Sequence, residues 1–242
     1  MSGHNKWSKI QHQKGRTDKA RSSVFTKLLR TVTIAAQKGS DPNMNFSLRL
    51  AIDKAKSENV PKDNIERAIK RGSGEGKEGV VYEEGIYEGF GPGGVAILVE
   101  TLTDNNNRTV SEMKHLFSKY GGTLGASGSV QWQFKRYGVV RISQEEKNKI
   151  TDWESFELEL MDAGVEDIKE QEEGVELITS VENLKKVLDY LKQKNLTPED
   201  SGMEWVAKDT IELDNETGEK LDVLVEMLEE CDDVNEVYTN AR

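Results

Sequence analysis

The sequence predicts an α+β protein in which a small N-terminal helical domain precedes two α/β domains. Apolar residues recur at helical spacing as far as about residue 70, and at the spacing of strands and helices from about residue 82 onward. Between these regions lies the sequence RGSGEGKEG at residues 71–79, whose glycines and charges are typical of a linker. A chain of 242 residues is long enough for two or three modest domains.

The first domain is predicted to comprise residues 1–76, as a basic arm followed by three helices. Residues 1–22, here called the N-terminal arm, show no apolar period. From Ser23 onward apolar residues repeat every three and four positions, which predicts a helix. A second helix is expected around Leu48–Ala55. A third is expected to begin at Pro61, because proline is well suited to a first helical turn.

The rest of the chain is predicted to form a discontinuous α/β domain, residues 77–136 and 207–242, interrupted by an inserted domain at residues 137–206. The inserted domain has the order strand, helix, strand, strand, helix, strand, which is the ferredoxin-like plan. The helix and strands after it are too short to fold alone. We therefore expect them to return to the sheet that begins near Tyr82. Residues 130–134 alternate between apolar and polar side chains and predict a further strand.

The composition excludes several classes of protein. No apolar stretch approaches the roughly 18 residues of a membrane-spanning helix, and the N-terminus lacks the apolar core of a secretory signal, so we expect a cytoplasmic protein without a membrane partner. A single cysteine, Cys231, excludes an intrachain disulfide. The three histidines do not form a cluster with it, so the sequence predicts no metal site and no cofactor.

Charge is distributed unevenly along the chain. The net charge is −11, yet residues 1–77 hold 17 Lys and Arg against 7 Asp and Glu, while residues 78–242 hold 16 against 37. Residues 1–38 hold nine basic side chains and one acidic side chain. A basic segment of this kind indicates a polyanionic partner, and nucleic acid is the first candidate.

The N-terminal arm interleaves cations with imidazoles and one indole, a composition that can neutralise phosphates and stack on a base. The alternative is a solvated basic tail whose Trp7 packs against the helical domain. Further cations are expected on the face of the first helix opposite its apolar stripe. The predicted nucleic-acid contacts are His4, Lys6, Trp7, Lys9, His12, Lys14, Arg16, Lys19, Arg21, Lys27, Arg30 and Lys38.

A second group of polar residues could also contact nucleic acid. Asn105, Asn106, Asn107 and Arg108 precede a predicted helix and could bind an RNA edge or a phosphate. Asparagines in this position usually form turns and helix caps instead.

No motif in the sequence carries catalytic chemistry. Residues 89–94, GFGPGG, match the dinucleotide-binding pattern, but they join two strands and begin no helix, which favours a hairpin. Residues 125–129, GASGS, resemble a nucleophile elbow but precede a strand where that motif requires a helix. Acidic runs are interpreted as solvated faces. We therefore predict no catalytic residues, and an enzyme with an acidic interdomain active site is the least supported alternative.

Several longer motifs lie along the chain: GHNKW at 3–7, FTKL at 25–28, LRLAIDKA at 48–55, PKDNIERAIKRG at 61–72, YEGFGPGG at 87–94, LTDNNNRT at 102–109, GASGSV at 125–130 and VYTNA at 237–241. These motifs resemble the YebC family of bacterial regulatory proteins, which also includes a mitochondrial translational activator. One departure is Asn5, where the family usually has serine. The resemblance spans nearly the whole chain, although residues 137–206 match mainly in pattern.

The resemblance implies a non-enzymatic cytoplasmic protein with a helical domain and two α/β domains around a cleft. It leaves two functions open, because family members are named as DNA-binding transcriptional regulators and others resemble translation factors. The first helix offers few side chains able to discriminate base edges in a DNA groove, so we favour rRNA or tRNA on the ribosome, with duplex DNA as the alternative. The acidic domains are expected to face basic ribosomal proteins.

Overall fold

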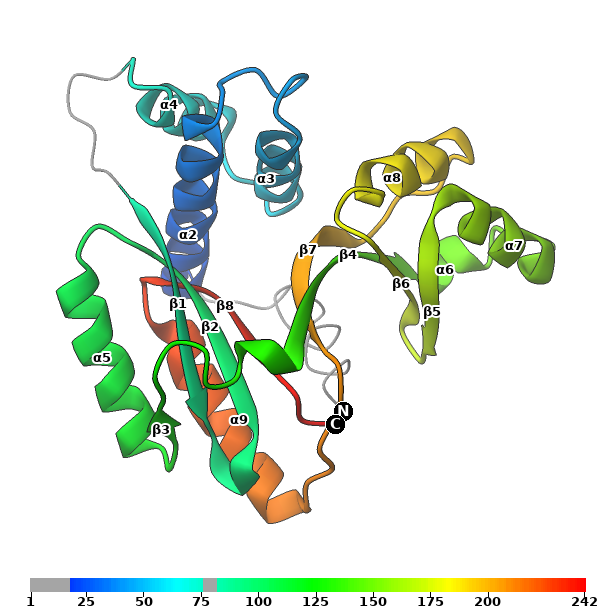
Figure 1. Cartoon of the computed structure of the whole chain (residues 1–242). Helices are drawn as coiled ribbons and strands as arrows, with labels where there is room; N and C mark the ends of the chain where they lie inside the picture. Colours follow the sequence, from blue (N-terminus) through cyan, green and yellow to red (C-terminus); the bar gives the residue numbers. More distant parts are fainter. Residues whose placement is uncertain (1–17, 76–81) are drawn as a thin grey trace. The chain divides into compact units, whose positions relative to one another are not determined.

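The computed structural model describes residues 18–75 and 82–242, and side chains are described from Ser22 onward. The chain divides into two compact units, residues 1–134 with 207–242 and residues 135–206. Figure 1 shows helices followed by two separate sheets, which confirms the predicted α+β class. Among the described residues, no helix is both long enough and apolar enough to cross a membrane.

The first unit begins with the three predicted helices: α2 (Asp18–Gln37), α3 (Phe46–Ser57) and α4 (Lys62–Gly72). The first of them starts at Asp18 rather than at the predicted Ser23, so residues 18–22 are helical. They form the N-terminal helical domain, which has its own apolar core built around Val32, Leu48 and Ile65. Asn45 fixes the turn between α2 and α3. Its side-chain oxygen accepts the Leu48 N–H at 3.0 Å, and its amide nitrogen donates to the backbone oxygens of Ala35 and Gly39.

A second core lies between a sheet and two helices in the same unit. The sheet has the order β3-β1-β2-β8, and its neighbouring strands are antiparallel. Phe117 and Leu224 pack from the helices against Ile97 and Val99 of the sheet. The elements are β1 (Glu83–Phe90), β2 (Ala96–Thr103), α5 (Asn106–Lys119), β3 (Thr123–Leu124), α9 (Asn215–Glu230) and β8 (Val234–Thr239).

Pairing within this sheet joins the two ends of the unit. β1 and β2 form a hairpin through the short 3-10 turn η2 (Pro92–Gly94), which confirms the hairpin interpretation of the glycine run. β8 pairs with β2, with Tyr238 opposite Leu98, so the segment after residue 207 returns to this sheet. Ile211 makes only an isolated bridge to Ala241, so the first of the short strands expected after the inserted domain is reduced to that bridge.

The strand predicted at residues 130–134 is wrong. Residues Gln131–Gln133 form a 3-10 turn, η3, and β4 (Phe134–Ser143) begins only at Phe134. The physical reason is the buried carboxylate of Glu88. It accepts the backbone N–H groups of Gly128 at 2.6 Å and of Val130 and Gln131 at 2.7 Å, so these groups serve a side chain rather than a neighbouring strand.

The second unit has the predicted ferredoxin-like plan. Its sheet has the order β5-β6-β4-β7, and two long helices follow the first and third strands. Leu160, Val187 and Leu191 of these helices are fully buried. The elements after β4 are α6 (Gln144–Lys147), α7 (Trp153–Ala163), β5 (Val165–Gln171), β6 (Gly174–Thr179), α8 (Leu184–Gln193) and β7 (Asp200–Ala207).

This second sheet contains a buried ionic cluster. The guanidinium of Arg141 on β4 contacts carboxylates of Glu176, Asp200 and Glu204 at 2.7, 3.4 and 2.7 Å. Burial by itself would lower the pKa of Arg141, but the surrounding carboxylates raise it, so the arginine remains charged.

Gly72, the last residue of α4, packs directly on α2. A Cβ atom at this position would lie 2.1 Å from the backbone oxygen of Thr33 and 2.7 Å from the Cβ of Ala36. Gly72→Ala should therefore lower the free energy of unfolding by about 1 to 3 kcal/mol, because backbone cannot yield to a methyl group. Urea unfolding of the full chain measures the change.

Gly218→Ala is the matched control for this substitution. Gly218 lies within α9, and a Cβ there would meet no atom within 4 Å. Alanine should raise the free energy of unfolding by up to about 1 kcal/mol through helix propensity. A Gly72→Ala protein as stable as the unsubstituted chain would show that α4 does not depend on this close approach.

Candidate nucleic-acid interface

Most of the predicted contact residues of the N-terminal arm lie outside the described residues. This applies to His4, Lys6, Trp7, Lys9, His12, Lys14 and Arg16, and to the side chains of Lys19 and Arg21. The remaining predicted residues are described: Lys27, Arg30 and Lys38 on or just after α2, and the group from Asn105 to Arg108 at the start of α5.

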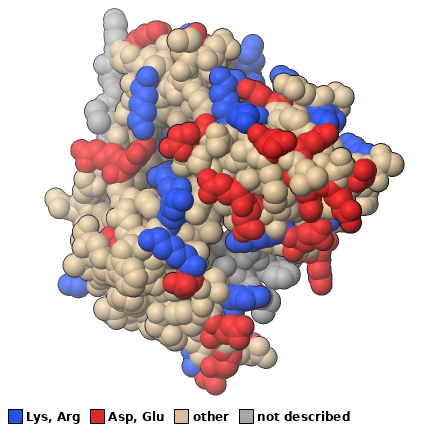
Figure 2. Space-filling model, turned by 45° about the vertical axis from the view of Figure 1, so that its right-hand side comes forward, with Lys and Arg blue, Asp and Glu red and all other residues tan. Residues whose placement is uncertain are grey.

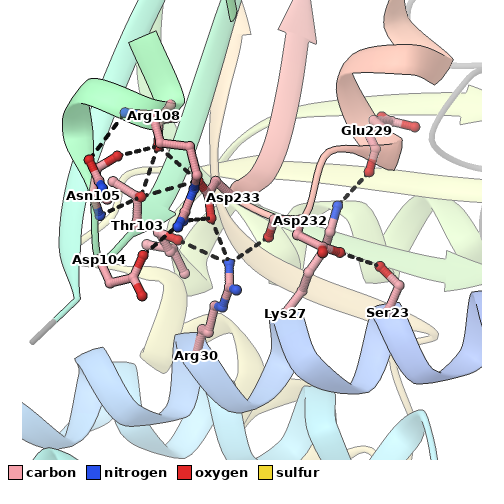
Figure 3. Close-up of polar contacts among 12 residues, drawn as sticks. Ser23, Lys27, Arg30, Thr103, Asp104, Asn105, Arg108, Glu229, Asp232 and Asp233 are labelled. Carbon is pink, nitrogen blue, oxygen red and sulfur yellow. Dashed lines mark hydrogen bonds and ion pairs between the residues drawn. The ribbon is translucent and has the colours of Figure 1, made fainter. Parts of the chain in front are cut away.

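The prediction that Lys27 and Arg30 lie on an open face of the first helix is wrong. Lys27 Nζ donates to the backbone oxygen of Glu229 at the end of α9. Arg30 donates to the backbone oxygen of Asp232 at 2.7 Å and to the carboxylate of Asp233 at 3.1 Å. Both cations therefore face the corner between α9 and β8 (Figure 3). The apolar period of α2 could not reveal this, because the acceptors lie about 200 residues away in the chain.

Burial changes the chemistry of these two cations. Desolvation lowers the pKa of Lys27, and the nearby Cys231 and the acidic residues Glu229 and Asp232 partly oppose this shift. The Arg30 side chain retains only 16% exposure. Both groups are partly buried in the α9–β8 corner, so the protein surface leaves a phosphate less access to them than to an exposed cation. Lys38, just beyond the end of α2, is exposed.

Asp233 is the centre of a polar cluster that joins three elements. It is 3% exposed, and it binds Arg30 of α2 and Arg108 of α5, the latter at 2.9 Å. The hydroxyls of Thr103 and Thr109 donate to its Oδ2 at 3.2 and 2.8 Å. Burial alone would raise the pKa of Asp233, but the hydrogen bonds from Arg108 and Thr109 outweigh it and lower the pKa. We call these five residues the Asp233 cluster.

The predicted secondary contact, Asn105 to Arg108, has mainly structural partners. Asn105 is the N-cap of α5 and accepts the Arg108 N–H at 3.1 Å. Asn106 donates its amide to Glu83. The Arg108 guanidinium lies between Asp233 and Asp104, and hydrogen bonds to both raise its pKa. Asn107 is exposed and accepts a hydrogen bond from Ser111 through its backbone oxygen, so the capping alternative is confirmed for Asn105 alone.

Sequence reasoning missed a set of exposed cations on the outer side of α4. Ile65 and Ala68 are buried, and Arg67, Lys70 and Arg71 are exposed, with Arg67 held by the side chain of Asn64. The helical period of the apolar residues could have identified this face. Basic side chains visible in Figure 2 are dispersed among acidic and uncharged ones rather than joined in one continuous face.

The described residues offer little for catalysis. No group of three or more His, Cys, Asp or Glu side chains among them is arranged to hold a metal ion. Burial raises the pKa of the Cys231 thiol to about 11, so it is protonated and unreactive at neutral pH. The GASGS motif at 125–129 lies in the turn whose backbone N–H groups bind Glu88. Burial by itself would raise the pKa of Glu88, but the hydrogen bonds from these three N–H groups outweigh it and lower the pKa.

Two family models match the chain and together span most of it. The model described as the TACO1/YebC protein N-terminal domain matches residues 5–75, and the model described as the TACO1/YebC second and third domain matches residues 82–241. The chain belongs to the TACO1/YebC family. The resemblance seen in the sequence motifs is thereby confirmed.

Similar proteins support this assignment over the full length. Relatives from Thermotoga maritima and Desulfosudis oleivorans are each 47% identical, over 99% and 100% of this chain and 93% and 96% of their own lengths. Both are named probable transcriptional regulatory proteins. The crystal structure of a conserved hypothetical protein from Aquifex aeolicus is 39% identical, with a TM-score of 0.83 over 94% of this chain and 92% of that one, so the fold is shared.

The Asp233 cluster of this TACO1/YebC protein should be sensitive to substitution. Asp233→Asn removes the charge that two arginines share and should lower the free energy of unfolding by about 2 kcal/mol. This is below the ~3 to 5 kcal/mol typical of a fully buried pair, because the Arg108 side chain is 49% exposed. Asp53→Asn is the control, because Asp53 is 64% exposed and only 3.9 Å from Lys56.

The effect of Asp233 should also depend on pH. Its pKa is lowered in the folded protein, so its stabilising contribution is complete above the unfolded value of about 3.9 and is lost as the pH falls through the folded value. Urea unfolding of both proteins at several pH values should therefore show curves that converge below about pH 4. A difference that stays constant down to pH 2 would contradict this account.

Proposed function

We propose that this TACO1/YebC protein is a non-enzymatic, nucleic-acid-binding regulator of gene expression that acts on ribosomal RNA as a translational activator. The observation that carries the proposal is the excess of basic over acidic side chains in residues 1–77, which hold 17 basic and 7 acidic side chains. Since Lys27 and Arg30 are used in internal contacts, the N-terminal arm and the exposed cations of α4 supply the charge for phosphate binding.

The packing of α2 favours RNA over sequence-specific DNA. A DNA-reading helix lies in the major groove with several polar side chains free to reach base edges. α2 packs instead against α3 and α4 on one side and against β8 on another. The exposed side of α4 is also poorly suited to reading base edges, because it carries the acidic residues Asp63 and Glu66 beside its cations. The side chain of Asn64 accepts a hydrogen bond from Arg67. Recognition by an arm suits irregular RNA, which is bound through shape, phosphates and unpaired bases.

The negative charge of residues 78–242 favours a partner that combines RNA with basic proteins. Residues 78–242 hold 16 basic and 37 acidic side chains, so most of their surface would be repelled by bare duplex or open rRNA. Basic ribosomal proteins beside the rRNA would complement this charge. A ribosome offers both surfaces together, which neither naked DNA nor free RNA does.

A second candidate function is DNA-binding transcriptional regulation. The observation in its favour is the printed name of the relatives, which describes those proteins as probable transcriptional regulators. The two functions differ in the affinity that they require for a particular duplex sequence.

Paired titrations at one physiological salt concentration separate these functions. We expect binding to purified ribosomes that saturates near one copy per particle, and weak, salt-sensitive binding to promoter and random duplexes alike. Co-sedimentation and fluorescence anisotropy measure the two. Nanomolar preference for one duplex over the random sequence, without ribosome association, would establish the transcriptional function instead.

Two substitutions in the N-terminal arm should separate stacking from charge. Trp7→Ala should weaken RNA binding by about 1 to 3 kcal/mol at every salt concentration, because stacking releases no counterions. Lys6→Ala should weaken binding and also reduce the salt dependence by about one phosphate contact. The measurement is affinity for ribosomal RNA across a salt series.

Lys220→Ala serves as the control for the arm, because Lys220 is an exposed cation on the acidic helix α9, paired with Glu216 at 2.7 Å. It should leave the affinity and the salt slope unchanged. If Trp7→Ala lowers the melting temperature of the free protein as strongly as it lowers affinity, Trp7 packs against the helical domain and does not stack on RNA.

A further inference from the structure

Trp132 is an exposed tryptophan that the function proposed above does not use. Its side chain is 66% exposed, whereas tryptophan is highly buried on average in folded proteins. It lies in the turn η3 of the first unit, between the buried residues Val130 and Phe134. The exposed ring next to this well-packed segment leaves a large aromatic surface available to a ligand.

The backbone around Trp132 is fixed by hydrogen bonds on both sides. Before it, the N–H groups of Val130 and Gln131 donate to Glu88 at 2.7 Å. After it, the oxygen of Gln133 accepts the Lys208 N–H at 2.8 Å, and its side chain accepts the amide of Asn240 at 3.2 Å. The ring is therefore presented from an ordered turn, so a ligand need not pay the entropy of ordering a loop.

The polar group of the indole is already satisfied inside the protein. Nε1 donates to the backbone oxygen of Ser129 at 3.1 Å. A ligand at Trp132 would consequently meet only the π surface of the ring and would bind by stacking rather than by a directional hydrogen bond. Planar bases are suited to such a surface, and stacking on it tolerates any base.

A cation lies beside the backbone of Trp132. Lys208 Nζ donates to the backbone oxygen of Trp132 at 2.6 Å, and the lysine is exposed. An ammonium group has three donors, so two remain for a phosphate. Lys208 and Trp132 therefore place a positive charge next to a stacking surface within the acidic part of the chain. Proteins use this combination to bind single-stranded nucleic acid.

We propose that Trp132 is a stacking platform for an unpaired base of single-stranded RNA, with Lys208 contacting a neighbouring phosphate. The inference rests on the proposed function and adds a base contact in the α/β domain to the contacts of the N-terminal arm. Because the site is a single ring and a single charge, it holds the strand without selecting a base.

The test uses the full chain and a single-stranded oligouridylate of about a dozen nucleotides that carries one 4-thiouridine. Trp132→Ala should weaken binding about 5- to 150-fold, the range measured for loss of one base–aromatic stack. Trp132→Phe should retain most of the affinity, and Trp132→Leu should lose it, because leucine keeps apolar bulk without a π face. Irradiation should crosslink the oligonucleotide to the peptide that contains Trp132.

Leu158→Ala is the matched control, because Leu158 is also 66% exposed but is aliphatic and lies on α7 of the other unit. It should bind like the unsubstituted chain, and melting temperatures should be equal for all four variants. If Trp132→Leu binds RNA as well as Trp132→Phe does, apolar bulk is sufficient at this position and the stacking proposal is wrong.

Failure of this inference differs from failure of the proposed function. If Lys6→Ala weakens binding while Trp132→Ala does not, RNA binding stands and the stacking platform is overturned. If the unsubstituted chain binds neither the oligonucleotide nor the ribosome, both proposals fall together.

Discussion

The buried carboxylate of Asp233 is the interaction on which the arrangement of the first unit depends. It lies just before β8, and it holds Arg30 of the helical domain and Arg108 of α5 while two threonine hydroxyls satisfy its remaining lone pairs. A buried charge is tolerated only when it is paired and hydrogen-bonded. The same contacts that make Asp233 acceptable in the interior therefore join the helical domain to the sheet, because the partners come from three elements, α2, α5 and β2.

The contacts around Asp233 determine which basic side chains remain available to bind a polyanion. Arg30 pairs with Asp233, and Lys27 donates to the backbone oxygen of Glu229 near the end of α9, so these cations of α2 are engaged in internal contacts. Basic charge that looks uniform along residues 1–38 thus serves two purposes. The cations of α2 near the corner stabilise the fold, and those of the N-terminal arm and the outer side of α4 are the ones assigned to phosphate. The proposed RNA-binding function follows from this division.

Glu88 is a second buried carboxylate that is satisfied by hydrogen bonds, in this case from backbone N–H groups. Three backbone N–H groups of the segment 128–131 surround its buried carboxylate, and the segment becomes a turn instead of a strand. The glycine-rich motif at 125–129 has the conformational freedom that such a turn requires, with Gly128 at a φ of +85°. By fixing this turn, Glu88 also fixes the position of Trp132, so a structural carboxylate determines where an exposed aromatic ring is presented.

The sequence by itself determined the elements that local periodicity encodes. Apolar residues at helical spacing predicted α2, α3 and α4, and the order of strands and helices predicted the ferredoxin-like unit, because side-chain spacing depends only on neighbours in the chain. The structure alone decided the partners of charged groups. Lys27 and Arg30 were predicted to be exposed on the helix but hydrogen-bond to acceptors at and near Asp233. The alternating residues 130–134 were predicted to form a strand, but the hydrogen bonds to Glu88 hold them in a turn. Such pairings join distant residues, and no local pattern encodes them.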